Sequence, residues 1–212
     1  MASAVSHPVF ARAFPAMSRA LEAGGMAGRR KDLLAGLGRR GHRHRRRHRT
    51  GLRSLPRRRD RVLAVEPEPR LRALATAAAR AVPVPVEVTG GTAGALPAAD
   101  AGYDAAAASF VLCTVPDQDA ALAEIRRVLR PGATLCFLEH LRAGTPGLVR
   151  VQRLLAATVW PHLLGRCHLS RDTAAAIKRA GFTITTLEHF LFPAARTPVS
   201  FHIAGHATAP GR

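Results

Sequence analysis

The feature that most limits how this chain can fold is a basic stretch from Arg39 to Arg59. It reads RRGHRHRRRHRTGLRSLPRRR, with 11 Arg, 3 His and no acidic residue. Like charges repel one another, and the stretch has few apolar side chains to bury, so it is poorly suited to form a packed strand. The whole chain has a formal net charge of +18, and about +7 remains when these 11 arginines are set aside. The other residues therefore have the charge of an ordinary soluble domain.

Taken as written, the basic stretch is a candidate polyanion-binding segment. Its guanidinium groups suit the phosphates of nucleic acid or of anionic lipid. No aromatic residue is interleaved with them to stack on bases, so binding through Arg39–Arg59 would be nonspecific.

A second interpretation of the same stretch comes from the genetic code. Only Lys31 and Lys178 are Lys among 32 basic residues, which indicates a GC-rich coding sequence and CGN codons for Arg. Under a shift of one base, residues 39–49 can read GGVIDIGAGTG and residues 50–59 can read LAFAHYPAAV. This alternative is a strand, a glycine loop and a helix start, which suits a nucleotide-like cofactor. The first strand is therefore expected to be disrupted in the chain as written.

Three cysteines, Cys113, Cys136 and Cys167, are far apart in the sequence and have no metal-ligand spacing. We expect reduced intracellular thiols, without a disulfide framework and without a metal site. No apolar run of about 18 residues is present, and charged residues interrupt the N-terminal region. The expectation is a cytoplasmic protein with no signal peptide and no transmembrane segment.

The remaining residues alternate between strand and helix patterns. Residues 3–37 predict two helices broken at Gly24-Gly25, as either an arm packed on the domain or a lid over an acceptor pocket. Strands are predicted at 60–66, 84–88, 103–110 and 133–140, and helices at 68–81, from Asp117, at 146–164 and after a Ser170 cap. Two final strands, FTITTLEHFLF and SFHIAGHAT, lack a helix between them and should pair antiparallel. This order predicts an α/β fold with a doubly wound sheet.

Two polar residues stand at the ends of predicted strands. Glu66 ends the strand at 60–66, about 20 residues beyond the region of the shifted glycine loop, where an acid binds ribose hydroxyls. It could equally be a solvated strand-end acid. His140 ends a later strand, where open α/β sheets bind ligands. It is either a weak candidate catalytic residue or a hydrogen-bonded structural histidine.

Several segments carry a family resemblance. They are VLAVEPEP, GTAGALP, YDAAAASFVLCTVPD, LAEIRRVLRPGATLCFLEH and GRCHLSRDTAAAIKRAGF. From Asp60 onward the chain resembles class I S-adenosylmethionine-dependent methyltransferases, in particular the small type 11 group that acts on alkyl thiols, phospholipids or quinones. The resemblance implies a Rossmann-like sheet whose last strand is antiparallel.

The same resemblance implies roles for individual residues. Glu66, next to Pro67, would meet the ribose of S-adenosylmethionine, Thr92 and Ala93 would lie by the adenine, and Ser109 would lie under the methionine arm. A small-molecule acceptor would take the methyl group by in-line transfer, which depends mainly on alignment.

The chain is accordingly divided into three parts: a helical arm at 1–38, the basic segment at 39–59 and the rest of a methyltransferase domain at 60–212. The predicted function is methyl transfer, impaired by the missing glycine loop. The alternative is an inactive methyltransferase-like domain that binds nucleic acid through its basic segment.

Overall fold

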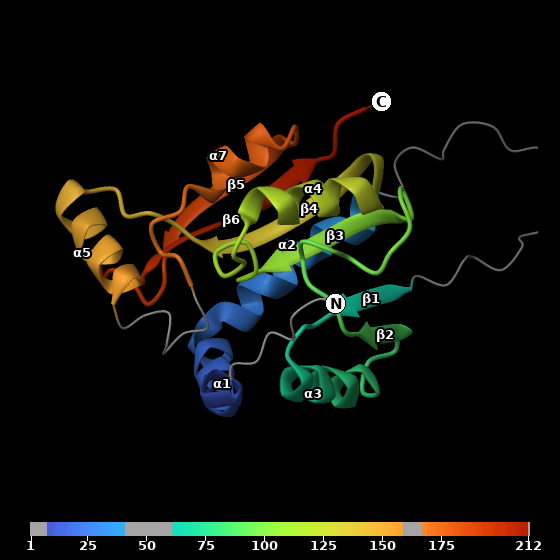
Figure 1. The fold of residues 1–212 in the computed structure, drawn as a ribbon, viewed down its shortest axis with the longest axis horizontal. Helices are drawn as coiled ribbons and strands as arrows, with labels where there is room; N and C mark the ends of the chain where they lie inside the picture. Colours follow the sequence, from blue (N-terminus) through green and yellow to red (C-terminus); the bar gives the residue numbers. More distant parts are fainter. Residues whose placement is uncertain (1–7, 41–60, 159–166, 212) are drawn as a thin grey trace, which may run out of the picture.

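The computed structural model describes residues 8–40, 61–158 and 167–211. Within these ranges strands are interspersed with helices, and the chain closes with two antiparallel strands, as the sequence predicts (Figure 1). Arg39 and Arg40 end a helix, and the remainder of the basic segment at 41–59 lies outside the described residues.

Four strands form the larger sheet, in the order β3-β4-β6-β5. β3 pairs parallel with β4, whereas β6 lies between β4 and β5 and is antiparallel to both. The predicted closing hairpin is therefore confirmed. The strand bounds are β3 Tyr103–Ser109, β4 Leu129–His140, β5 Thr183–Leu191 and β6 Phe201–Thr208.

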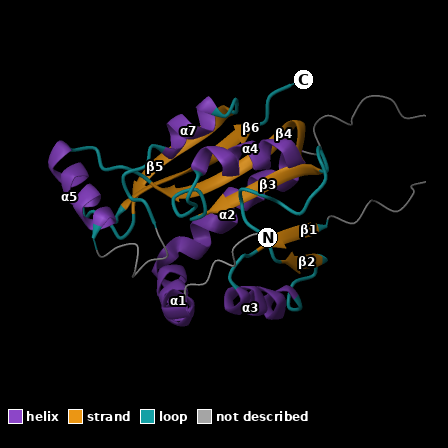
Figure 2. Cartoon of the chain, in the orientation of Figure 1, coloured by secondary structure: helices purple, strands orange, loops and turns teal. Residues whose placement is uncertain are grey.

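Helices cover both faces of this sheet (Figure 2). Side chains alternate along β4, because successive residues of a strand point to opposite faces. Leu135 and Phe137 pack into the main core with residues of α4 and α7, whereas Cys136 and Leu138 pack against α2. The helices are α2 Ala27–Arg40, α4 Gln118–Val128 and α7 Thr173–Arg179.

The helix starts show one correct and one wrong prediction. Asp117 caps α4 as expected, and its Oδ1 accepts the backbone N–H of Ala120 at 2.9 Å. Ser170 does not cap α7. Asp172 does so instead, with Oδ1 accepting the N–H of Ala175 at 3.0 Å. Asp172 directly precedes the first helical residue, which is the position from which a short side chain reaches the free N–H groups.

Helix α5 spans Pro146–Ala157, and residues 159–164 of the longer predicted helix lie outside the described ranges. At the N-terminal side, α1 Pro8–Leu21 continues through a π-helical segment, η1 Glu22–Met26, into α2, with a kink at Gly25 where φ is +112°. No described helix has both the length and the apolar character needed to cross a bilayer.

The smaller sheet contains only two parallel strands, β1 Val62–Val65 and β2 Val86–Thr89. Helix α3, Pro69–Ala79, packs on β2, and none of its residues is buried. In the described part of the chain, no strand pairs with the second edge of β1 or with the second edge of β3. Among the described residues the strands thus form two separate sheets, and the region of the predicted first strand beyond Arg40 lies outside those residues.

Candidate functional site

Glu66 stands immediately after β1. Its backbone N–H donates to the Thr89 carbonyl at 3.0 Å, which continues the pairing with β2. Carboxylate Oε1 accepts the backbone N–H of Glu68 at 2.9 Å, and Oε2 accepts no hydrogen bond from the described residues. Partial burial raises the pKa of this carboxyl group. Glu66 therefore presents a half-buried acceptor oxygen at the end of a parallel strand.

Thr92 and Ala93 lie in the loop that follows β2. Gly91 brings this loop against the end of β1, since a Cβ at Gly91 would lie 2.9 Å from Val65 Cγ1. The Ala95 N–H closes the loop by donating to the Thr92 carbonyl at 3.1 Å. The structure therefore brings Thr92 and Ala93 to the same end of the two-stranded sheet as Glu66.

Helix α4 holds the far side of this loop. Glu124 Oε2 accepts the Leu96 N–H at 2.8 Å, and Arg127 donates to the Leu96 carbonyl at 3.0 Å and to the Ala98 carbonyl at 2.8 Å. Arg127 also pairs with Glu124, and this hydrogen bond lowers the pKa of Glu124 to about 2. A helix of the larger sheet thus fixes the loop of the smaller one.

Ser109 ends β3 and meets the N-terminal arm. Its Oγ accepts a hydrogen bond from Arg30 Nε at 3.2 Å, and the Arg30 guanidinium lies 5.6 Å from the Phe110 ring centroid. Burial lowers the pKa of Arg30, which also pairs with Glu22. Met26 is fully buried nearby, against the face of β4 that carries Cys136 and Leu138. The arm is therefore packed on the domain. Of the two interpretations of residues 3–37, the packed arm agrees with these contacts.

The carboxyl end of β4 carries a buried acid that the sequence did not single out. Glu139 is fully buried, and its carboxylate accepts the backbone N–H groups of Val111, Leu112 and Cys113 at 2.9 to 3.0 Å. Burial raises the pKa of Glu139, and the three N–H donors oppose that rise. The carboxylate fixes the turn that follows β3 to the end of β4.

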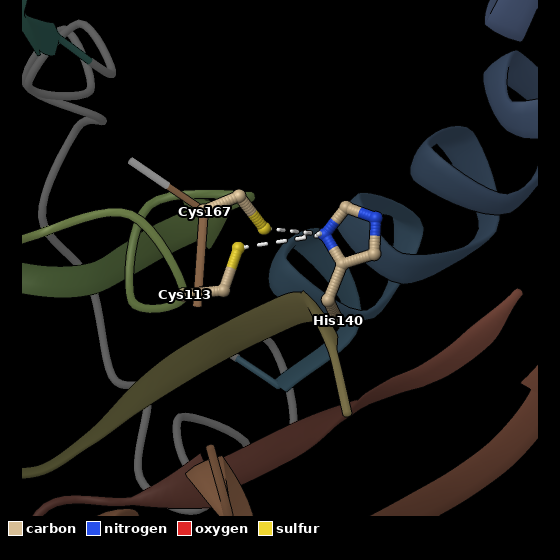
Figure 3. A group of neighbouring side chains, drawn as sticks. All are labelled: Cys113, His140 and Cys167. Atoms are coloured by element: carbon tan, nitrogen blue, oxygen red, sulfur yellow. Dashed lines mark hydrogen bonds between the residues drawn. The ribbon is translucent and has the colours of Figure 1, made fainter. Parts of the chain in front are cut away.

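His140 lies beside two thiols at the same strand end (Figure 3). His140 Nδ1 is 3.5 Å from Cys113 Sγ and 3.4 Å from Cys167 Sγ, and these three atoms all lie within 4.8 Å of one another. The hydrogen bond from Cys113 lowers the pKa of Cys167 to about 5, with a further contribution from His140. Burial raises the pKa of Cys113. The pair therefore favours one thiolate, on Cys167.

The sequence did not predict this grouping, because 27 residues separate each cysteine from His140. One signal was present: Cys113 follows the end of β3, and His140 is the end of β4. Parallel neighbouring strands bring such positions to one edge of a sheet. Cys167 comes to this edge through a loop, and no sequence rule predicts that path.

The predicted site residues form two groups. Glu66, Pro67, Thr92 and Ala93 lie at the end of the smaller sheet, whereas Ser109 and His140 lie at the end of the larger sheet, where Ser109 pairs in register with Leu138. The basic segment at 39–59, where a glycine loop is expected from the resemblance, lies outside the described residues beyond Arg40.

A family model described as a methyltransferase domain matches residues 50–137. The match begins beyond residues 39–49, the positions of the shifted glycine loop. It confirms the resemblance inferred from the sequence segments.

Similar proteins of known name include human thiol S-methyltransferase TMT1A, which is 34% identical over 109 residues, covering 51% of this chain and 45% of that protein. Rat thiol S-methyltransferase TMT1B is 39% identical over 111 residues, with the same coverage of 51% and 45%. The ubiquinone/menaquinone biosynthesis C-methyltransferase UbiE of Methylobacterium nodulans is 40% identical over 73 residues, 34% of this chain and 29% of that protein. The matched part of this chain thus spans less than half the length of these relatives.

Solved structures share the fold. A SAM-dependent methyltransferase from Methanosarcina mazei superposes with a TM-score of 0.58 at 19% identity, covering 72% of this chain and 83% of that chain. The 4+2 cyclase SpnF superposes with a TM-score of 0.57 at 19% identity, covering 72% and 67%. The predicted α/β, Rossmann-like fold is confirmed. Since one of these neighbours is named a cyclase, the fold alone does not define the reaction.

Proposed function

We propose that this chain, which carries a methyltransferase domain on a fold shared with S-adenosylmethionine-dependent enzymes, transfers a methyl group to a small-molecule acceptor. The observation that carries the proposal is Glu66, a half-buried carboxylate immediately after β1 with one oxygen that accepts no hydrogen bond from the described residues. The names of the relatives make a thiol the first acceptor class to test and a quinone precursor the second.

The described residues suit both ends of S-adenosylmethionine, the adenosine end and the methionine end. Glu66, beside Pro67, would accept the ribose hydroxyls, and the loop at Thr92 and Ala93 would face the adenine. At the other end, Arg30 sits on Ser109, and its guanidinium, which also pairs with Glu22, would lie near the carboxylate of the methionine arm. When bound, S-adenosylmethionine supplies an electrophilic methyl group.

Catalysis in this site would come mainly from alignment, which needs no dedicated base. His140 remains the candidate side chain near the acceptor. Its Nδ1 is already engaged by two thiols, so only Nε2 could exchange a proton with an acceptor.

The basic segment at 39–59 is the part of the chain that opposes cofactor binding. Seven of its eleven arginines stand at 39–49, the positions of the shifted glycine loop, which would meet a positively charged sulfonium. We infer that the chain divides into a helical arm at 1–38, the basic segment at 39–59 and the methyltransferase domain remainder at 60–212, and that the basic segment impairs the enzyme. We also infer that the protein is cytoplasmic. Nonspecific polyanion binding through Arg39–Arg59 is the alternative activity, supported only by charge.

The test compares two forms of the full chain, the natural form and a restored form with GGVIDIGAGTG at 39–49 and LAFAHYPAAV at 50–59. Binding is measured by calorimetry with S-adenosylmethionine, and methyl transfer by label incorporation into a small alkyl thiol. The restored form should bind and methylate. Glu66→Gln in it should weaken binding about 10- to 100-fold, the loss expected for a hydrogen bond to a charged group.

A matched control is Glu87→Gln, a neighbouring acid on β2 that forms an exposed ion pair with Arg61. It should leave binding unchanged. A restored, folded chain that binds no S-adenosylmethionine would sink the methyltransferase proposal. Loss of polyanion affinity on restoration, without any cofactor binding, would favour the alternative.

A further inference from the structure

We propose that Cys113, His140 and Cys167 form a binding site for one zinc-like divalent metal ion at the carboxyl end of β4. The ligand atoms are the two Sγ atoms and His140 Nδ1 (Figure 3). This inference does not depend on methyl transfer.

The two sulfur–nitrogen distances match those of a tetrahedral metal site, and the two sulfurs lie within 4.8 Å of each other. With a zinc–sulfur bond of about 2.3 Å and a zinc–nitrogen bond of about 2.0 Å, a tetrahedral angle separates sulfur from nitrogen by about 3.5 Å. The two observed sulfur–nitrogen distances are 3.5 and 3.4 Å. A metal ion can therefore enter between the three atoms with little movement of the side chains.

The backbone around Cys113 is fixed on both sides. Its N–H donates to Glu139 at 3.0 Å, and its carbonyl accepts the N–H of His168 at 2.7 Å. The second bond ties the turn of Cys113 directly to the loop of Cys167. Arg171 adds hydrogen bonds to the Leu112 carbonyl at 2.8 Å and to the Val115 carbonyl at 2.7 Å. The two thiols are thus held together by bonds that do not involve sulfur.

The His140 ring is fixed by its aromatic neighbours. Its centroid lies 4.9 Å from the Phe110 ring and 4.5 Å from the His202 ring. This orientation directs Nδ1 toward both sulfurs. A metal site needs such a third ligand atom, whereas a disulfide between Cys113 and Cys167 would not.

The charge of the site also fits a divalent ion. Two thiolates and one neutral imidazole around a divalent ion have no net charge, so burying the loaded site avoids the cost of an isolated ion. Cys113 is fully buried and Cys167 is 5% exposed. Thiolate and imidazole ligands suit zinc, and three protein ligands leave one position for water or another exogenous ligand.

The experiment uses the full chain without a histidine tag, loaded with cobalt(II) as a spectroscopic substitute and with zinc for stoichiometry by mass spectrometry. We expect one metal per chain and a thiolate-to-cobalt charge-transfer band. Cobalt held only by histidines of the basic segment, His42, His44 and His48, gives no such band. Cys113→Ser, Cys167→Ser and His140→Gln should each weaken binding about 100-fold or more, since second-shell changes alone cost 10- to 100-fold.

Cys136→Ser is the matched control, because Cys136 is also a buried cysteine outside any disulfide but belongs to the core face under α2. It should keep the band. The unaltered chain provides a readout that needs no variant: zinc should slow alkylation of Cys113 and Cys167 relative to a chelator-treated sample, and leave Cys136 unaffected. The proposal is overturned if the folded chain shows no thiolate band, if the ligand variants keep it, or if Cys113 and Cys167 are recovered as a disulfide from freshly reduced protein.

Discussion

The larger and the smaller sheets of this chain follow the same strand–helix pattern, yet they bury very different amounts of apolar surface. Leu122, Phe137 and Ile203 of the larger unit are fully buried. In the smaller unit Val62 is 45% exposed and Leu74 is 47% exposed. Strand β4 is packed against helices on both faces, whereas β1 has one strand neighbour among the described residues. A correct local pattern therefore gives a strand and a helix. A buried core also requires other strands and helices that pack around them.

The largest expected effect comes from restoring the predicted first strand, which would lie beside β1. Restoring GGVIDIGAGTG at 39–49 and LAFAHYPAAV at 50–59 should raise the free energy of unfolding by at least about 4 kcal/mol. A new central strand would pair with β1 and β3, and each newly buried valine-sized side chain contributes about 1.5–3 kcal/mol. Urea unfolding measures the gain, and hydrogen exchange should show new protection in β1 and β2. A scrambled replacement of the same composition is the control, and equal stabilisation by it would contradict the comparison.

A matched pair of truncations tests the difference in burial directly. Leu122→Ala in α4 should destabilise the chain by about 2–5 kcal/mol, because it leaves a cavity in the main core. Leu74→Ala in α3 should change stability by less than about 0.5 kcal/mol, since the side chain is largely exposed. Chemical denaturation of both variants gives the two values. Similar losses would show that the smaller unit has a core of its own.

Glu139 tests the polar part of the larger unit. Glu139→Gln retains the size of the side chain but replaces one acceptor oxygen with a donor that faces backbone N–H groups. The expected loss is about 1–3 kcal/mol. Glu188→Gln is the control: its side chain is 61% exposed and pairs with Arg29 at the surface, so a change below about 0.5 kcal/mol is expected. Thermal unfolding compares them, and equal effects would remove the structural role inferred for Glu139.

The smallest effect concerns the link between the two units through Glu124. The pKa of this carboxyl group falls from 4.5 to about 2 in the folded chain, so its ionised form stabilises the fold. That contribution is complete above pH 4.5 and disappears as the pH falls through about 2. Glu124→Gln should therefore flatten the pH dependence of unfolding in this window. An unchanged profile would show that the bond between Glu124 and Arg127 does not stabilise the folded chain.

Sequence periodicity predicted most of the fold. The order of strands and helices, the Asp117 cap and the antiparallel closing pair all follow from patterns within a few residues. The Ser170 cap was wrong because two candidate caps lie two residues apart, and packing selected Asp172. The expected disruption of the first strand stays a prediction, because residues 41–60 lie outside the described residues.

The candidate site likewise contains residues that the sequence predicts and contacts that it does not. Glu66 and His140 could be found from the sequence because each is a polar residue at the end of an apolar run. The contact of Arg30 with Ser109, across 79 positions, and the meeting of Cys113 with Cys167 at His140 depend on how helices and loops return to the sheet. The sequence by itself determined which residues end the strands, because strand ends are local. Only the tertiary structure decided which side chains meet there, because those contacts arise when distant elements pack.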